Sequence, residues 1–137
     1  MQDITLTIKG YHSEDGEENN IEFITEGRLG YEEGSYVIEY DESEISGIKN
    51  TTTRLLVSDD CVRMARGGSI DTEFVFAQTR QFEAQYETSF GTINVSVFPT
   101  QVISEVSDSE GMIDLEYTMK IGGTEAFNRL FINYKAQ

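Results

Sequence analysis

Apolar and polar residues alternate along most of the chain. In residues 4–9, Ile, Leu and Ile alternate with Thr, Thr and Lys, and residues 113–119 repeat the pattern. A period of two places every second side chain on the same face of an extended strand. The sequence therefore predicts β-strands that each bury one face, and no long window shows the period of an amphipathic helix.

Clusters of Gly, Asp, Asn and Ser divide these runs into about nine or ten short strands. We expect a solvated loop at the polar segment 13–20, a strand end near Pro99, and room for one helical turn at residues 100–107. The strands are expected at residues 4–9, 21–25, 36–40, 51–57, 61–66, 70–76, 82–87, 93–97, 113–119 and 126–134.

The short connections determine how these strands can pair. Parallel pairing needs crossover helices, which the pattern does not provide, so neighbouring strands are expected to be antiparallel. Strands with one apolar face must close on themselves or stack as two sheets, and closure also removes exposed edges. The prediction is an all-β, closed, antiparallel up-and-down barrel of about 8–10 strands with little or no helix. A sandwich is the second choice, and residues 1–137 are expected to form a single domain.

Charge excludes several classes of partner. The chain has 25 acidic and 10 basic residues, a formal net charge of -15, so its field repels phosphate backbones and anionic lipid surfaces. We therefore expect no binding to nucleic acid or membranes. No apolar run is long enough to span a bilayer, and no secretion signal is recognised. Cys61 is the single cysteine, which fits a reducing compartment, and a cytoplasmic location is expected.

A series of short motifs resembles a known family. The motifs are Tyr-Val-Ile-Glu-Tyr-Asp-Glu at 36–42 followed by Gly47, three threonines at 51–53, Val-Arg-Met-Ala-Arg-Gly-Gly at 62–68, Tyr-Glu-Thr-Ser-Phe-Gly at 86–91, and Gly-Met-Ile-Asp-Leu-Glu-Tyr at 111–117. In order and spacing they resemble the YwiB-like bacterial family of unknown function. The resemblance implies a calycin-like, lipocalin-like β-barrel and brings no established activity. The chain has no Trp, so the Gly-x-Trp opening of lipocalins is absent.

Some predicted strands carry a polar residue on their apolar face. Arg66 shares the parity of Val62 and Met64, and the same argument assigns Glu42 and Thr88 to the interior at the ends of their strands. Tyrosine hydroxyls are expected close by. The candidate residues of this interior are Arg66, Glu42, Tyr40, Tyr86, Thr88 and Tyr117.

Two interpretations of Arg66 are open. A guanidinium cannot release its charge, and burying it unpaired costs several kcal/mol, so it needs an anionic partner. Glu42 is the expected partner, and the pair would then brace one end of the barrel. Alternatively, Arg66, followed by Gly67 and Gly68, binds the carboxylate or phosphate of a ligand inside the barrel. A register error in the strand assignment would remove both interpretations.

No catalytic, metal or cofactor motif stands out. His12 is the only histidine, and it is expected at an exposed strand end beside the acidic segment. That segment lacks the ordered ligand spacing of a calcium loop. Asp59 and Asp60 precede Cys61, and their negative charge would weaken its thiol as a nucleophile. We expect no enzymatic activity, no metal and no cofactor.

The expected function is therefore a non-enzymatic binding module. A barrel of about eight strands can hold one small ligand or be filled by its own side chains. The first case favours a small, partly apolar anionic ligand. The alternative is a protein–protein interaction or regulatory module, and a homodimer through an outer sheet face is also possible. In that alternative the interior would be filled by Tyr36, Phe74, Phe76, Tyr86 and Tyr117.

Overall fold

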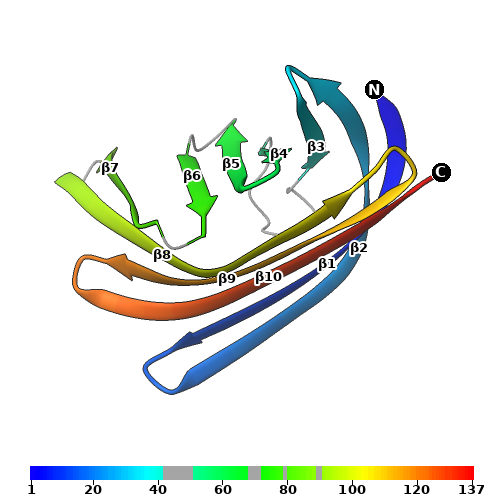
Figure 1. Ribbon diagram of the computed structural model, residues 1–137. Helices are drawn as coiled ribbons and strands as arrows, with labels where there is room; N and C mark the ends of the chain where they lie inside the picture. Colours follow the sequence, from blue (N-terminus) through cyan, green and yellow to red (C-terminus); the bar gives the residue numbers. More distant parts are fainter. Residues whose placement is uncertain (42–50, 68–71, 79, 89–90) are drawn as a thin grey trace.

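A computed structural model describes residues 1–41, 51–67, 72–78, 80–88 and 91–137, with the backbone only at 86–88. Within these ranges the chain forms ten antiparallel strands, and no helix occurs that could cross a bilayer. The strands curve into a nearly closed barrel (Figure 1). They are β1 (Gln2–Glu14), β2 (Glu17–Glu32), β3 (Ser35–Asp41), β4 (Thr52–Ser58), β5 (Cys61–Gly67), β6 (Thr72–Ala77), β7 (Phe82–Thr88), β8 (Gly91–Val106), β9 (Glu110–Ile121) and β10 (Thr124–Ala136).

Pairing of the first and last strands organises the sheet. The order is β6-β5-β4-β3-β2-β1-β10-β9-β8-β7. Apart from β1 and β10, all neighbouring strands are consecutive in the sequence. The barrel is completed where β6 meets β7, and in the described residues the β-bridge at this point joins Ala77 of β6 to Arg80, which precedes β7. The all-β, antiparallel up-and-down prediction is confirmed, and in the part of the chain that the structure describes the barrel is nearly closed, with the seam between β6 and β7.

The loop predicted at residues 13–20 is wrong. β1 and β2 continue through the segment, and their hairpin turns at Asp15 and Gly16, which have φ values of 50° and 82°. Positive φ at both central residues is typical of a type I′ turn, which suits the twist of paired strands. The charged side chains do not prevent strand formation here, because residues 15–20 are exposed to water and no charge has to be buried.

The strand end at Pro99 and the helical turn at 100–107 are also wrong. β8 runs from Gly91 to Val106, and its register with β9 shifts between Pro99 and Gln101. A bulge accommodates a residue that has no N–H for the ladder, so the strand bends at the proline and continues.

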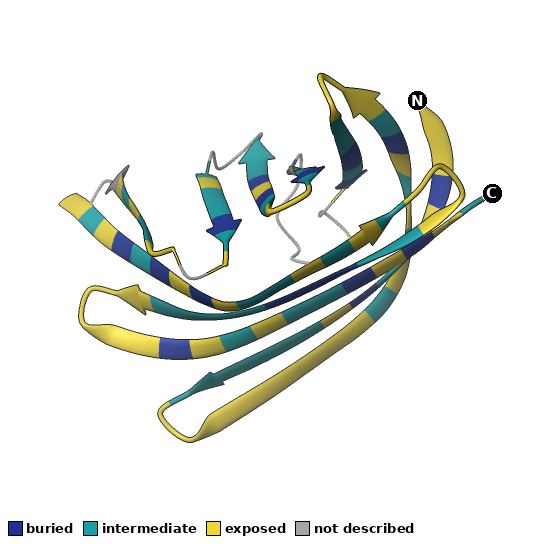
Figure 2. Ribbon diagram, viewed as in Figure 1, coloured by how far each residue is buried: buried dark blue, intermediate teal, exposed yellow. Residues whose placement is uncertain are grey.

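The core follows the predicted alternation. Figure 2 shows buried and exposed positions succeeding one another along the long strands. On β5, Val62 and Met64 are buried, whereas Arg63 between them is exposed. Val62 and Met64 therefore lie on the inner face. Other fully buried side chains come from the short strands β3, β4 and β6 and from the long strands β1, β9 and β10: Ile4, Leu6, Ile38, Leu55, Phe76, Ile113, Leu115, Ile132 and Tyr134.

Candidate functional site in the barrel interior

A row of polar side chains crosses the inner wall of the four short strands β3 to β6. The register pairs Tyr40 with Thr53, Thr53 with Arg66, and Arg66 with Thr72. Neighbouring strands lie about 4.8 Å apart, so the four residues occupy one continuous strip. Tyr40 is 4% and Thr53 0% exposed, and Arg66 and Thr72 are half-buried. We call these four residues the Arg66 row.

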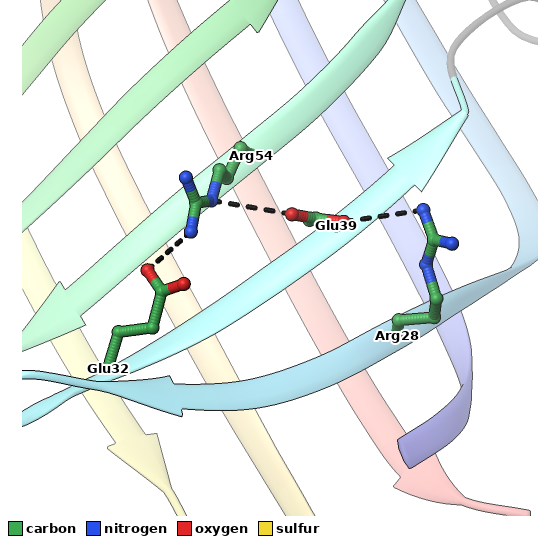
Figure 3. Close-up of polar contacts among 4 residues, drawn as sticks. All are labelled: Arg28, Glu32, Glu39 and Arg54. Atoms are coloured by element: carbon green, nitrogen blue, oxygen red, sulfur yellow. Dashed lines mark hydrogen bonds and ion pairs between the residues drawn. The ribbon is translucent and has the colours of Figure 1, made fainter. Parts of the chain in front are cut away.

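The outer face of the same wall is charged. Arg28 on β2 lies 3.3 Å from Glu39 on β3, and Arg54 on β4 lies 3.4 Å from the other carboxylate oxygen of Glu39 (Figure 3). Arg54 also pairs with Glu32. These partly exposed pairs add little stability, but they mark the water-facing side. Because side chains alternate, their sequence neighbours Tyr40 and Thr53 face inward.

A second polar row lies on the long-strand wall. Tyr117 on β9 pairs with Asn128 on β10, which pairs with His12 on β1. The Nδ1 atom of His12 donates a hydrogen bond to Oδ1 of Asn128 at 2.6 Å, and its Nε2 lies 3.5 Å from Glu14. His12 has the inward parity of Ile8, and it lies near the end of β1 with 43% of its side chain exposed, as expected for a histidine at a strand end.

Tyr117 connects the two walls. Its ring centroid lies 4.8 Å from that of Phe76 on β6. Burial raises the pKa of the Tyr117 hydroxyl, and the positive charge of Arg66 acts in the opposite direction. The guanidinium of Arg66 and the hydroxyl of Tyr117 therefore interact electrostatically inside the barrel.

This burial predicts a pH dependence. A tyrosine with a raised folded-state pKa contributes stability that is fully present below its ordinary pKa of 10.0 and is lost as the pH rises through the raised value. The Tyr117→Phe variant removes the ionisable hydroxyl, and with it this pH dependence. Above pH 10 we expect its unfolding free energy to fall less steeply than that of the parent, by up to about 1.4 kcal/mol per pH unit. Urea titrations between pH 8 and about pH 11 measure this, and parallel curves would contradict it.

Apolar rings surround the polar rows. The ring of Phe74 lies 6.4 Å from that of Phe76 and 6.4 Å from that of Phe82, which brings β6 and β7 together at the seam. A fixed cation and several hydroxyls set among aromatic rings favour a molecule with one anionic end and an apolar body. In the described ranges, His, Cys, Asp and Glu do not gather in groups of three that could hold a metal ion.

The structure places some of the predicted site residues and leaves others as predictions. Arg66 and Tyr40 share one row, and Tyr117 lies close enough across the interior for its pKa to respond to Arg66. Glu42 lies outside the described residues, so its pairing with Arg66 stays a prediction. For Tyr86 and Thr88 the structure gives the backbone on β7, paired with Ile93 and Gly91 of β8, and not the side chains.

Sequence reasoning missed four members of the two rows. Thr53 has the parity of Leu55 and Val57, so the argument used for Arg66 would have identified it. Thr72 has the parity of Phe74 and Phe76 in the same way. His12 and Asn128 are 116 residues apart, and no local pattern connects them.

Comparisons with known proteins agree with this architecture. A family model described as a domain of unknown function, DUF1934, matches residues 6–132. An uncharacterized beta-barrel protein, YwiB of Bacillus subtilis (strain 168), is 27% identical over 134 residues, which is 96% of this chain and 92% of that protein. The crystal structure of ywiB protein from Bacillus subtilis matches with a TM-score of 0.85 at 24% identity, over 99% of this chain and 92% of that one.

Proposed function

The chain belongs to the DUF1934 family, a domain of unknown function, and we propose that its calycin-like barrel is a non-enzymatic module that binds a small, partly apolar anion against Arg66. The observation that carries this proposal is a permanent cation on the otherwise apolar inner face of β5, beyond the buried Val62 and Met64. A guanidinium offers a planar fork of donors that matches a carboxylate or a phosphate.

The neighbours of Arg66 suit such a ligand. Thr53 lies beside it in the Arg66 row and Tyr40 lies one strand further on, and their hydroxyls can add hydrogen bonds to an anionic group held there. Tyr117 approaches from the opposite wall, and the partly buried ring of Phe74, two residues from Thr72 on β6, offers an apolar surface. Most small-molecule sites combine a largely apolar lining with a few polar groups that fix orientation.

A second candidate function rests on the packing of the other barrel end. There Tyr36 donates a hydrogen bond to Asp108 at 2.9 Å, and Tyr134 donates to the carbonyl of Ser107 at 2.7 Å, so side chains connect β3 and β10 to the turn between β8 and β9. Phe76 is only 1% exposed. If the whole interior is filled in this way, the barrel is a protein–protein or regulatory module whose surface carries the function.

Two further expectations belong to this proposal. The absence of enzymatic activity is expected because the sequence has no recognisable nucleophile, base or metal motif, and His12 is its single histidine. A cytoplasmic location is supported by the single Cys61, a composition that needs no oxidising compartment.

Octanoate and 1-octanol provide a matched pair of probes, because they share an apolar chain and differ in charge. We expect the parent to bind octanoate more tightly than octanol in calorimetric titrations. The Arg66→Gln variant should lose about tenfold or more of its octanoate affinity, since a hydrogen bond to a charged group contributes about 1.5–3 kcal/mol. Octanol affinity should change little.

The control for this experiment lies on the same strand. Arg63 is exposed on the outer face of β5, and Arg63→Gln removes the same charge without touching the interior. Equal loss in both variants would point to the general field of the protein and contradict the proposal. Failure of the parent to bind either probe, together with a strongly destabilised Arg66→Gln variant, would favour the internal brace. Native mass spectrometry of protein from its own host would then be expected to show no retained small molecule.

A further inference from the structure

The hairpin of β1 and β2 projects beyond the short strands of the barrel. β1 pairs with β2 along its whole length, whereas β3 pairs with β2 only over Gly27–Glu32. In Figure 1 the hairpin reaches away from β3 toward the lower left. Ile21 has the inward parity of Phe23 but is 54% exposed, so this half of the hairpin extends past the core.

The projecting half of β2, residues 17–26, has one edge paired with β1. In the part of the chain that the structure describes, no strand forms a ladder with its other edge. The connection from Asp41 back to its cross-strand partner Thr52 is too short to follow that edge to its end and return. A row of backbone donors and acceptors of this length is a template for one more strand, so it suits an extended segment of polypeptide. We call residues 17–26 the β2 edge.

Carboxylates along the β2 edge determine the charge of a suitable partner. Glu18, Glu22 and Glu26 face outward at every fourth position, and all three are exposed. The β2 edge contains no Lys or Arg, and β1 contributes one base, Lys9, which lies opposite Glu22. Opposite charges on neighbouring strands attract, and like charges directly opposite each other are destabilising. A complementary strand therefore carries Lys or Arg.

The inward positions of the β2 edge add an apolar requirement. Ile21 is exposed and Phe23 is half-buried on the inner side of the hairpin. Side chains of an added strand would alternate between this side and the side of the carboxylates. The partner then needs apolar residues at every second position, with Lys or Arg at every fourth position between them.

A second copy of this chain does not match the β2 edge. Two copies paired about a two-fold axis at Glu22 would set Glu22 against itself and Glu18 against Glu26. The net charge of -15 on each copy also opposes their approach. Charge therefore favours a basic strand over self-association.

We propose that the β2 edge binds a basic, extended segment of another polypeptide as an additional strand of the ten-stranded sheet. Main-chain hydrogen bonds provide the affinity, and the carboxylates together with Ile21 and Phe23 provide the specificity. The contact lies outside the barrel, so it is independent of the anion site around Arg66.

A synthetic peptide with blocked ends, Lys-Val-Thr-Val-Lys-Val-Thr-Val-Lys, has the complementary pattern. N-methylation of alternate residues prevents the peptide from pairing with itself and leaves one edge able to bind. We expect this peptide to bind the full chain in calorimetric titrations. It should also slow the exchange of those amides of the β2 edge that point away from β1. The same peptide with Glu in place of Lys should bind about tenfold more weakly or worse, and a peptide N-methylated at every residue should not bind.

The double variant Glu18→Gln/Glu22→Gln tests the protein side of the contact. It should weaken binding of the Lys peptide about fivefold, because two cross-strand charge pairs are lost. The matched control is Glu105→Gln/Glu110→Gln, which removes two exposed carboxylates from β8 and β9 and should leave the affinity unchanged.

Several results would overturn the proposal. They are failure of the parent to bind the Lys peptide, equal binding of the Lys and Glu peptides, equal weakening in the two double variants, and exchange protection confined to other strands. Slow exchange of every amide of the β2 edge in the chain alone would show that this edge is already paired, and it would overturn the proposal as well.

Discussion

Replacing Phe76 with alanine is expected to lower the free energy of unfolding by about 3–5 kcal/mol, the range found for buried phenylalanines. Phe76 is 1% exposed, and its ring lies between those of Phe74 and Tyr117, at 6.4 and 4.8 Å. These contacts join β6 to the opposite wall near the seam of the barrel. Removing the ring therefore loses the free energy gained by burying it. It also leaves a cavity, which the two sides of the barrel cannot close by relaxation.

Urea or guanidinium titrations measure this effect, and Phe98→Ala is the control. Phe98 is 40% exposed on the outer face of β8, so its truncation should cost well under half as much. Similar losses for the two variants would show that Phe76 does not support the barrel as the contacts indicate.

The same variant helps to separate the two candidate functions. If the parent interior is filled, Phe76→Ala creates a new apolar cavity, and benzene should stabilise the variant and not the parent. If the parent already has space for a ligand beside Tyr117, benzene should stabilise both. The second result would support a binding barrel, and the first would favour the interaction module.

Gly27→Ala is expected to cost about 2–3 kcal/mol, in the upper range for overpacking a tight site. A Cβ atom at this position would lie 2.5 Å from the carbonyl oxygen of Glu39 and 2.5 Å from a methyl carbon of Leu6. The first contact is with backbone, so β2 and β3 would have to separate. Because Gly27 pairs with Tyr40, the displacement would reach the Arg66 row and should also reduce octanoate affinity.

Gly10→Ala is the control for this substitution in the neighbouring strand. Its Cβ would lie 4.0 Å from Cβ of Ile21, an ordinary van der Waals distance. We expect a change within about 0.5 kcal/mol, because a strand alanine also restricts the unfolded chain. Chemical unfolding of both variants gives the comparison, and a cost for Gly10→Ala as large as that for Gly27→Ala would contradict the steric explanation.

Sequence patterning predicted much of the fold and part of the candidate site. The parity of Val62 and Met64 correctly placed them in the core and put Arg66 on the same face. The all-β barrel and the family resemblance are confirmed. The errors at residues 13–20 and around Pro99 share one cause. Local charge, or a residue without an N–H, ends a strand only where no neighbouring strand pairs with that segment. Here β1 and β2 pair beyond the core, and a bulge absorbs the proline.

Alternation is a local property of the extended backbone, so the sequence by itself determined which side chains share a face. Register depends on contacts between distant segments, and only the tertiary structure decided it. That is why the step from Tyr40 through Thr53 to Arg66, and the pairing of His12 with Asn128, had to come from the structure. The pairing of β1 with β10 is equally non-local, since it joins the two ends of the chain and closes a loop of nearly its whole length.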